Sequence, residues 1–177
     1  MEDYRRYYNL ESYLFEEVGP KFREHGHLSV YDFFCVLAWI NSHWKSRIMT
    51  LLRTKGEKSL GVTVEKLAKE LWKKHSAKDQ LAYLMEEWRL GLPVASAILA
   101  VLRPDDFIIY DRRVCKVTNS PEMQGMVWSE LLWNKYSQYK NKVEQQAPKN
   151  FSLRDKHQWL MGKFFHDTQV QWLTEET

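Results

Sequence analysis

One carboxylate in this sequence has surroundings that suit a chemical role. Asp111 follows the short apolar run of residues 107–110, and Arg112 and Arg113 come directly after it, where a new helix is predicted to begin. A carboxylate at a helix start is stabilised by the N–H groups of the first turn and by the helix dipole. Carboxylates held in this way can act as bases or stabilise developing positive charge.

Each of these residues also has an ordinary structural interpretation. Asp111 could be a simple N-cap. Asp105 and Asp106 are weaker catalytic candidates, because they look like turn residues. The positive charges of Arg112 and Arg113 are unfavourable near the positive end of the helix dipole. Contact with a phosphate group would offset this cost, but the two residues could equally be a solvated pair on the surface.

The element that must position Asp111 is a helix of small residues, predicted for residues 93–102. Its alanines and one serine allow close backbone approach, while its valines, leucines and isoleucine can fill a core. Pro93 is tolerated in the first turn, and Gly91 suits a tight turn into the helix. Pro104 ends the helix, because the residue before a proline is pushed out of the α region.

A second group of residues that could bind a ligand lies at the carboxyl-terminal end of another helix. This helix is predicted from Val30 to about Arg47. The helix is apolar almost all round, which is typical of a central helix, and it becomes polar after Ile40. Its end offers rings for stacking, hydrogen-bonding groups and two cations, namely Trp39, Asn41, Ser42, His43, Trp44, Lys45 and Arg47. A helix end with cations that suit its dipole is the alternative interpretation.

The order of turn, small-residue helix, apolar connection, aspartate and further helix resembles the core of the helix-hairpin-helix DNA glycosylases, the superfamily of endonuclease III. Gly91 matches the last glycine of that family's hairpin, Ala95 the alanine of the following helix, and Asp111 the catalytic aspartate. The match runs without a gap over residues 91–117, and a weaker match covers residues 29–47. Together these segments are about a quarter of the chain.

The sequence departs from this family at two places. The family's hairpin reads Leu-Pro-Gly-Val-Gly, whereas the equivalent residues 87–91 read Glu-Trp-Arg-Leu-Gly, so that only Gly91 is kept. Bifunctional members carry a lysine nucleophile eighteen positions before the aspartate, and Pro93 stands at that position here. Since proline has no amine, the resemblance implies a monofunctional enzyme without a Schiff-base lyase step.

The resemblance implies a fold and a set of contacts. The fold would be all-α and two-lobed with a central cleft, as one globular unit over residues 1–177. Residues 29–109 would form the central helical barrel, and residues 1–28 with 110–177 the second lobe. DNA would be contacted by the start of the small-residue helix, namely Gly91, Leu92, Val94, Ala95 and Ser96. Four cations would also contact DNA, namely Arg112, Arg113, Lys45 and Arg47.

The resemblance also implies an activity. A damaged or modified base would be extruded from double-stranded DNA, with Trp39, Asn41, Ser42, His43 and Trp44 forming the base pocket or filling the vacated stack. Asp111 would stabilise the oxocarbenium-like sugar or activate water as the N-glycosidic bond is hydrolysed. We expect a monomer that needs no metal or other cofactor. The alternatives are a non-catalytic DNA-binding protein on the same scaffold and a helical adaptor for protein partners.

The composition is compatible with these expectations. A chain of 177 residues with 44% hydrophobic residues can bury a sizeable core, and its net charge of +3 permits a polyanionic partner without requiring one. Cys35 and Cys115 lie in apolar runs and indicate buried free thiols in a reducing compartment. The four-cysteine iron–sulfur set of many endonuclease III relatives is lacking, so no such cluster is expected. Without a signal-peptide pattern or an apolar span, a cytoplasmic protein with no membrane contact is expected.

Helix start and stop signals predict most of the remaining elements. A first helix within residues 2–24 is expected to break at Gly19 and Pro20. Residues 119–121 are expected to open a helix that gives way to a loop within residues 134–150. Four helices are expected to begin at N-caps, namely Ser29, Thr63, Ser76 and Ser152.

Overall fold

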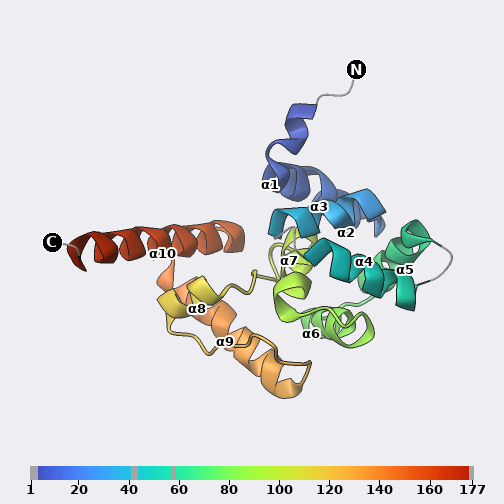
Figure 1. The fold of residues 1–177 in the computed structure, drawn as a ribbon. Coiled ribbons are helices and arrows are strands. Elements are labelled where there is room, and N and C mark those ends of the chain that lie inside the picture. Colours follow the sequence, from blue (N-terminus) through green and yellow to red (C-terminus); the bar gives the residue numbers. More distant parts are fainter. Residues whose placement is uncertain (1–3, 41–43, 57–58, 176–177) are drawn as a thin grey trace.

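Helix α7 (Leu92–Leu102) lies in the middle of the protein, as seen in the computed structural model (Figure 1). The structure describes residues 4–40, 44–56 and 59–175. Every residue of α7 except the half-buried Pro93 is buried. The described residues contain helices and no strands, which confirms the predicted all-α class.

The amino-terminal part of the chain packs around α7. The elements in chain order are η1 (Tyr4–Tyr7), α1 (Leu10–Tyr13), the wide turn η2 (Leu14–Val18), α2 (Gly19–His25), α3 (Val30–Ile40), α4 (Trp44–Lys55), α5 (Leu60–Trp72), α6 (Ala77–Ala82) and η3 (Tyr83–Glu87). Helices α2, α3 and α6 contact α7 directly. At Gly19 the approach is so close that an added Cβ would lie 2.5 Å from the Val101 carbonyl oxygen.

The last three helices pack mainly against one another. They are α8 (Arg112–Thr118), α9 (Glu130–Gln146) and α10 (Leu153–Glu175). Figure 1 shows that the carboxyl-terminal part of α10 extends away from the rest of the molecule. Phe165, Trp172 and Leu173 are exposed there.

Residues 103–111 connect the two groups of helices, and hydroxyl groups bind the backbone of this connection. The Tyr136 hydroxyl donates to the carbonyl of Ile108 (2.6 Å) and accepts from the N–H of Ile108 (3.1 Å). The Tyr139 hydroxyl donates to the Ile109 carbonyl (2.8 Å). The Ser96 hydroxyl of α7 accepts from the Tyr110 N–H (2.9 Å). Buried backbone groups that lack a sheet partner are thus paired by side chains.

Three of the four predicted N-caps are confirmed. Ser29, Ser76 and Ser152 each accept a hydrogen bond from the backbone N–H three residues later. The prediction for Thr63 is wrong, because Ser59 caps α5 by accepting from the Val62 N–H (3.2 Å). Thr63 is buried one turn inside that helix, where its hydroxyl donates to the Ser59 carbonyl.

The predicted break at Gly19 and Pro20 is also wrong, because helical turns continue from Leu10 to His25. The Gly19 N–H donates to the carbonyl of Leu14, five residues earlier, which makes the turn before the proline wider than an α-turn. Pro20 then lies in the first turn of α2, where its missing N–H needs no partner.

The predicted helix from Val30 to about Arg47 is two helices. Helix α3 ends at Ile40 and α4 begins at Trp44. The abrupt change from apolar to polar residues after Ile40 thus marks the end of a helix. Asn41, Ser42 and His43 lie outside the described residues.

The helix predicted to open at residues 119–121 begins later. Asn119 ends α8 in a left-handed conformation (φ 50°), and Ser129 caps α9, which continues to Gln146 through the segment predicted as a loop. The buried face of α9 consists of Leu132, Tyr136, Tyr139 and Val143 at helical spacing. The segment looks polar in the sequence because the rest of this helix carries Asn, Lys, Gln and Glu residues, of which Asn134, Gln138 and Asn141 are exposed.

We predict that Tyr136→Phe lowers the free energy of unfolding by about 1–3 kcal/mol, because the N–H and carbonyl of Ile108 lose their partner in a buried place. Urea denaturation would measure the change. Tyr8→Phe, at a tyrosine that is 96% exposed, is the control and should leave stability almost unchanged. Equal stability of the two variants would show that the hydroxyl of Tyr136 does not support the connection.

Candidate functional site

Asp111 is the N-cap of α8, as the sequence predicts. Its backbone is extended, and its Oδ1 accepts from the N–H of Arg113 at 2.7 Å. The Arg113 guanidinium also binds the carboxylate, with Nε 3.0 Å from Oδ1 and Nη2 2.7 Å from Oδ2. The Asp111 side chain is 18% exposed, so the carboxylate can still be reached from solvent.

The surroundings of Asp111 favour its charged form. Burial by itself would raise the pKa of the carboxyl group, but the hydrogen bonds and positive charge of Arg113 outweigh burial and hold the pKa below its ordinary value. Asp111 is therefore an anion at neutral pH. Such a group suits the stabilisation of positive charge better than the uptake of a proton.

Asp111 lines a shallow hollow of about 460 Å³, which we call the Asp111 hollow. Pro93, at the position matched to the family's lysine, lines the same hollow, so the structure brings the two positions together. The other lining residues are Tyr110, Arg112, Arg113, Lys116 and Gln124. Arg112 pairs with Glu122, and Arg113 pairs with Asp111.

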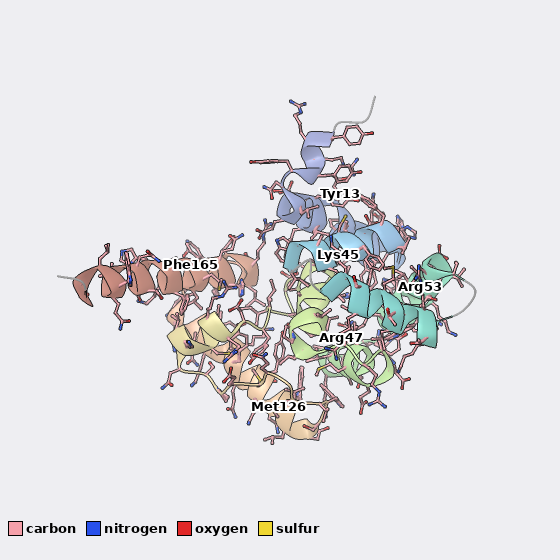
Figure 2. The ribbon with its side chains drawn as sticks, viewed as in Figure 1. Tyr13, Lys45, Arg47, Arg53, Met126 and Phe165 are labelled. Carbon is pink, nitrogen blue, oxygen red and sulfur yellow. The ribbon has the colours of Figure 1, made fainter. Side chains whose placement is uncertain are left out.

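A larger groove of about 820 Å³ adjoins this hollow, since Pro93 and Gln124 line both. The groove runs between α4, the turn that enters α7 and the loop before α9. We call it the arginine groove, because Arg47 and Arg89 line it. Glu86 is the acidic residue of its lining, and neither arginine forms an ion pair among the described residues. In Figure 2 Arg47 extends from α4 on the side of Met126, which also lines the groove.

Arg89 has an unusual backbone conformation. Its φ of 51° lies in the left-handed region, which glycine adopts more readily than other residues. In the family's hairpin pattern the equivalent position is a glycine. The turn into α7 therefore has a left-handed residue at the place where that pattern has glycine, even though the side chain here is an arginine.

The predicted contacts at the start of α7 could be made by its backbone. Gly91 is exposed as the N-cap, whereas the side chains of Leu92, Val94, Ala95 and Ser96 are buried. The N–H groups of Val94 and Ala95 donate to the Gly91 carbonyl. Among the described residues no backbone carbonyl accepts from the N–H groups of Gly91 and Leu92. These two N–H groups are therefore available to bind an anion.

The described residues among those predicted as a second binding group, at the end of α3 and the start of α4, do not line one common site. Arg47 lines the arginine groove, whereas Lys45 is half-buried on the same helix and does not. Trp39 packs edge-on against Phe15, with ring centres 5.6 Å apart, and lines a partly open cavity. Trp44 begins α4.

His157 on α10 was not among the residues singled out in the sequence. Burial lowers the pKa of its imidazole to about 4, against the opposing attraction of the Asp111 and Glu11 charges. The residue is therefore neutral at pH 7 and lies near enough to Asp111 to sense its charge. No local pattern in the sequence points to His157, because its neighbours come from distant segments. Arg89 also escaped notice, although the replaced hairpin glycine was a usable signal.

Both cysteines are buried and free, as expected. Burial, reinforced by the charges of Asp111 and Glu122, raises the pKa of the Cys115 thiol to about 12. Cys115 thus stays protonated and is a poor nucleophile. Among the described residues there is no group of three or more His, Cys, Asp or Glu side chains that could hold a metal ion.

The described helices include none with a stretch long and apolar enough to cross a membrane. We compared the chain with models of protein families, with curated proteins and with solved structures, and none of these three comparisons found a match.

We predict that His157 makes stability depend on pH. The unfolded chain takes up a proton on this residue below about pH 6.5, whereas the folded chain does so only near pH 4. The free energy of unfolding should therefore fall as the pH is lowered through this range, by roughly 3 kcal/mol in total. Urea denaturation at several pH values would measure this fall.

His157→Gln should lose most of this pH dependence. His166→Gln, at an exposed histidine of the same helix, should keep it. An unchanged slope in His157→Gln would mean that the imidazole is not held neutral by burial.

Proposed function

We propose that this protein is a monofunctional DNA glycosylase that removes a damaged or modified base by hydrolysis. The observation that carries the proposal is the charged Asp111 carboxylate in a hollow that continues into the arginine groove. An anion suits the oxocarbenium-like sugar that forms as the base leaves. The unpaired arginines of the groove suit the phosphates of the same strand.

The residues would divide the reaction between them. Arg47 and Arg89 would bind the DNA backbone along the groove, and the N–H groups of Gly91 and Leu92 would bind one phosphate at the start of α7. This contact would place the sugar of an extruded nucleotide beside Asp111. Because Pro93 offers no amine across the hollow, water would be the nucleophile and an abasic site the product.

Arg113 must release part of the Asp111 carboxylate for this chemistry. The guanidinium now binds both carboxylate oxygens, but the side chain is 45% exposed and can move to a phosphate. The N-cap hydrogen bond from the Arg113 backbone can persist meanwhile and keep Asp111 oriented.

The two-lobed fold remains part of the proposal, with residues 29–109 in one lobe and 110–177 in the other. Residues 1–28 were expected to join the second lobe, but their helical turns pack mainly on the first, where η2 and α2 contact α7. The separate packing of α8, α9 and α10 supports a division near residue 110. The left-handed Arg89 at the glycine position of the hairpin pattern supports the expected turn into α7.

One observation favours a non-catalytic DNA-binding protein instead. The bidentate contact with Arg113 gives Asp111 a complete structural role as an N-cap and ion-pair partner. A protein that had lost its chemistry could keep Asp111 for this reason alone.

A different observation favours an adaptor for protein partners. Such an adaptor would offer exposed apolar side chains, and Phe165, Trp172 and Leu173 on α10 are exposed.

Asp111→Asn separates these possibilities. Asparagine is as good an N-cap as aspartate, so the substitution should change the free energy of unfolding by less than about 1 kcal/mol. A glycosylase should nevertheless lose activity by about 100-fold or more, because the negative charge is gone. The assay would incubate duplexes, each with one modified base, and then cleave abasic sites with hot alkali.

Asp167→Asn is the matched control, because it removes an ion-paired aspartate on α10 away from the hollow. It should keep full activity. Strand cleavage that requires alkali and is lost only in Asp111→Asn would support the proposed function. No cleavage of any duplex, with DNA binding intact in all three proteins, would contradict it and favour the binding protein.

The arginine groove can be tested by DNA binding alone. Arg47→Glu and Arg89→Glu should each weaken binding to duplex DNA by roughly tenfold or more at low salt, because a repulsive charge replaces a phosphate contact. Arg53→Glu, on the exposed surface of the same helix as Arg47, is a control of equal charge (Figure 2). Titrations followed by fluorescence anisotropy would measure all three, and equal losses would mean that the groove is not the DNA-binding surface.

A further inference from the structure

The cavity lined by Trp39, of about 180 Å³, lies between α10 and the helices around α7. We call it the His157 cavity. Most of its wall is apolar and includes Phe15, Trp39, Ala100, Phe107, Ile109 and Met161. None of the residues that line it also lines the Asp111 hollow or the arginine groove.

The charged groups of the cavity are already paired. Glu11 accepts hydrogen bonds from Nε of Arg154 (2.9 Å) and from Nε2 of Gln158 (2.6 Å). The Arg154 guanidinium also lies 4.4 Å from the ring centre of Phe15. Since the anion and the cation neutralise each other, the cavity offers no net charge to a ligand.

His157 is the polar group of the cavity that lacks a partner. Its Nε2 is buried and has no hydrogen-bond partner among the described residues. A buried polar atom without a partner costs free energy, and such atoms are uncommon in folded proteins. His157 lines the cavity and no described residue binds its imidazole, so a molecule in the cavity with a hydroxyl or N–H group could form a hydrogen bond with this ring.

The size of the cavity limits what it can hold. An engineered apolar cavity of about 150 Å³ is known to bind benzene. The His157 cavity is slightly larger, and its wall includes the edge-to-face pair of Phe15 and Trp39. Rings of this kind pack well against another aromatic ring. One aromatic ring with a small substituent is therefore the fitting occupant.

We propose that the His157 cavity is a binding site for a small, uncharged aromatic molecule with one hydrogen-bonding group, which pairs with the imidazole of His157. The proposal does not depend on the function proposed for Asp111. Phenol is the simplest probe of this class. Toluene has nearly the same shape without the hydroxyl, and benzoate carries a charge.

The test is a titration of the full chain with each probe, followed by the backbone amide signals in NMR spectra. Phenol should shift the signals of residues around the cavity, and it should bind about fivefold or more tightly than toluene, because it alone can pair with His157. Benzoate should bind more weakly than either, since its charge would be buried without a partner.

Two variants and one control complete the test. His157→Leu should bring the affinity for phenol down to that for toluene, whereas His166→Leu, at an exposed position of the same helix, should not change it. Ala100→Leu should fill the cavity and weaken both probes, provided that its circular dichroism spectrum matches that of the unaltered chain. Phenol that shifts no cavity signal at millimolar concentration, or that binds equally to His157→Leu, would overturn the proposal.

Discussion

The candidate site depends on the pairing of a short irregular segment with tyrosine hydroxyls. Residues 107–110 carry Asp111 out of the buried interior, yet they belong to no helix or sheet that could pair their backbone. Tyr136 and Tyr139 of α9 bind this backbone from one side, and Ser96 of α7 binds it from the other. The direction in which Asp111 leaves the interior is thus set by two helices from the two groups, so a shift of either group against the other would move the carboxylate.

The electrostatics of Asp111 follow from this placement. The carboxylate lies far enough inside for burial to act on it, and it stays ionised because Arg113 is its immediate neighbour on α8. On the inner side His157 is held neutral, so it offers Asp111 no counter-charge there. The cations near Asp111 therefore lie on its solvent-facing side. A bound molecule that becomes positively charged would approach the carboxylate from the hollow.

The same connection lines two candidate sites of different character, since Ile108 and Ile109 line the His157 cavity and Tyr110 and Asp111 line the hollow. The hollow and groove are open, and their lining has more cations than anions, since Asp111 and Glu86 are the acidic residues among it. The wall of the His157 cavity is mostly apolar and its charged groups are paired, which suits a small neutral molecule. Ile108 and Ile109 precede Tyr110 and Asp111 directly in the chain, so the paired backbone of this segment positions the lining of both sites.

The sequence by itself determined the features that depend on neighbouring residues. The apolar helix before Pro104, the N-cap role of Asp111 and three serine caps rest on contacts within about four residues, which a local pattern can encode. Contacts between distant segments were decided only by the tertiary structure. Tyr136 meets Ile108 across 28 residues, and Arg154 meets Glu11 across 143. The separate positions of Trp39 and Arg47 and the burial of Nε2 of His157 are of this second kind, because packing between helices decides which face of each helix is covered.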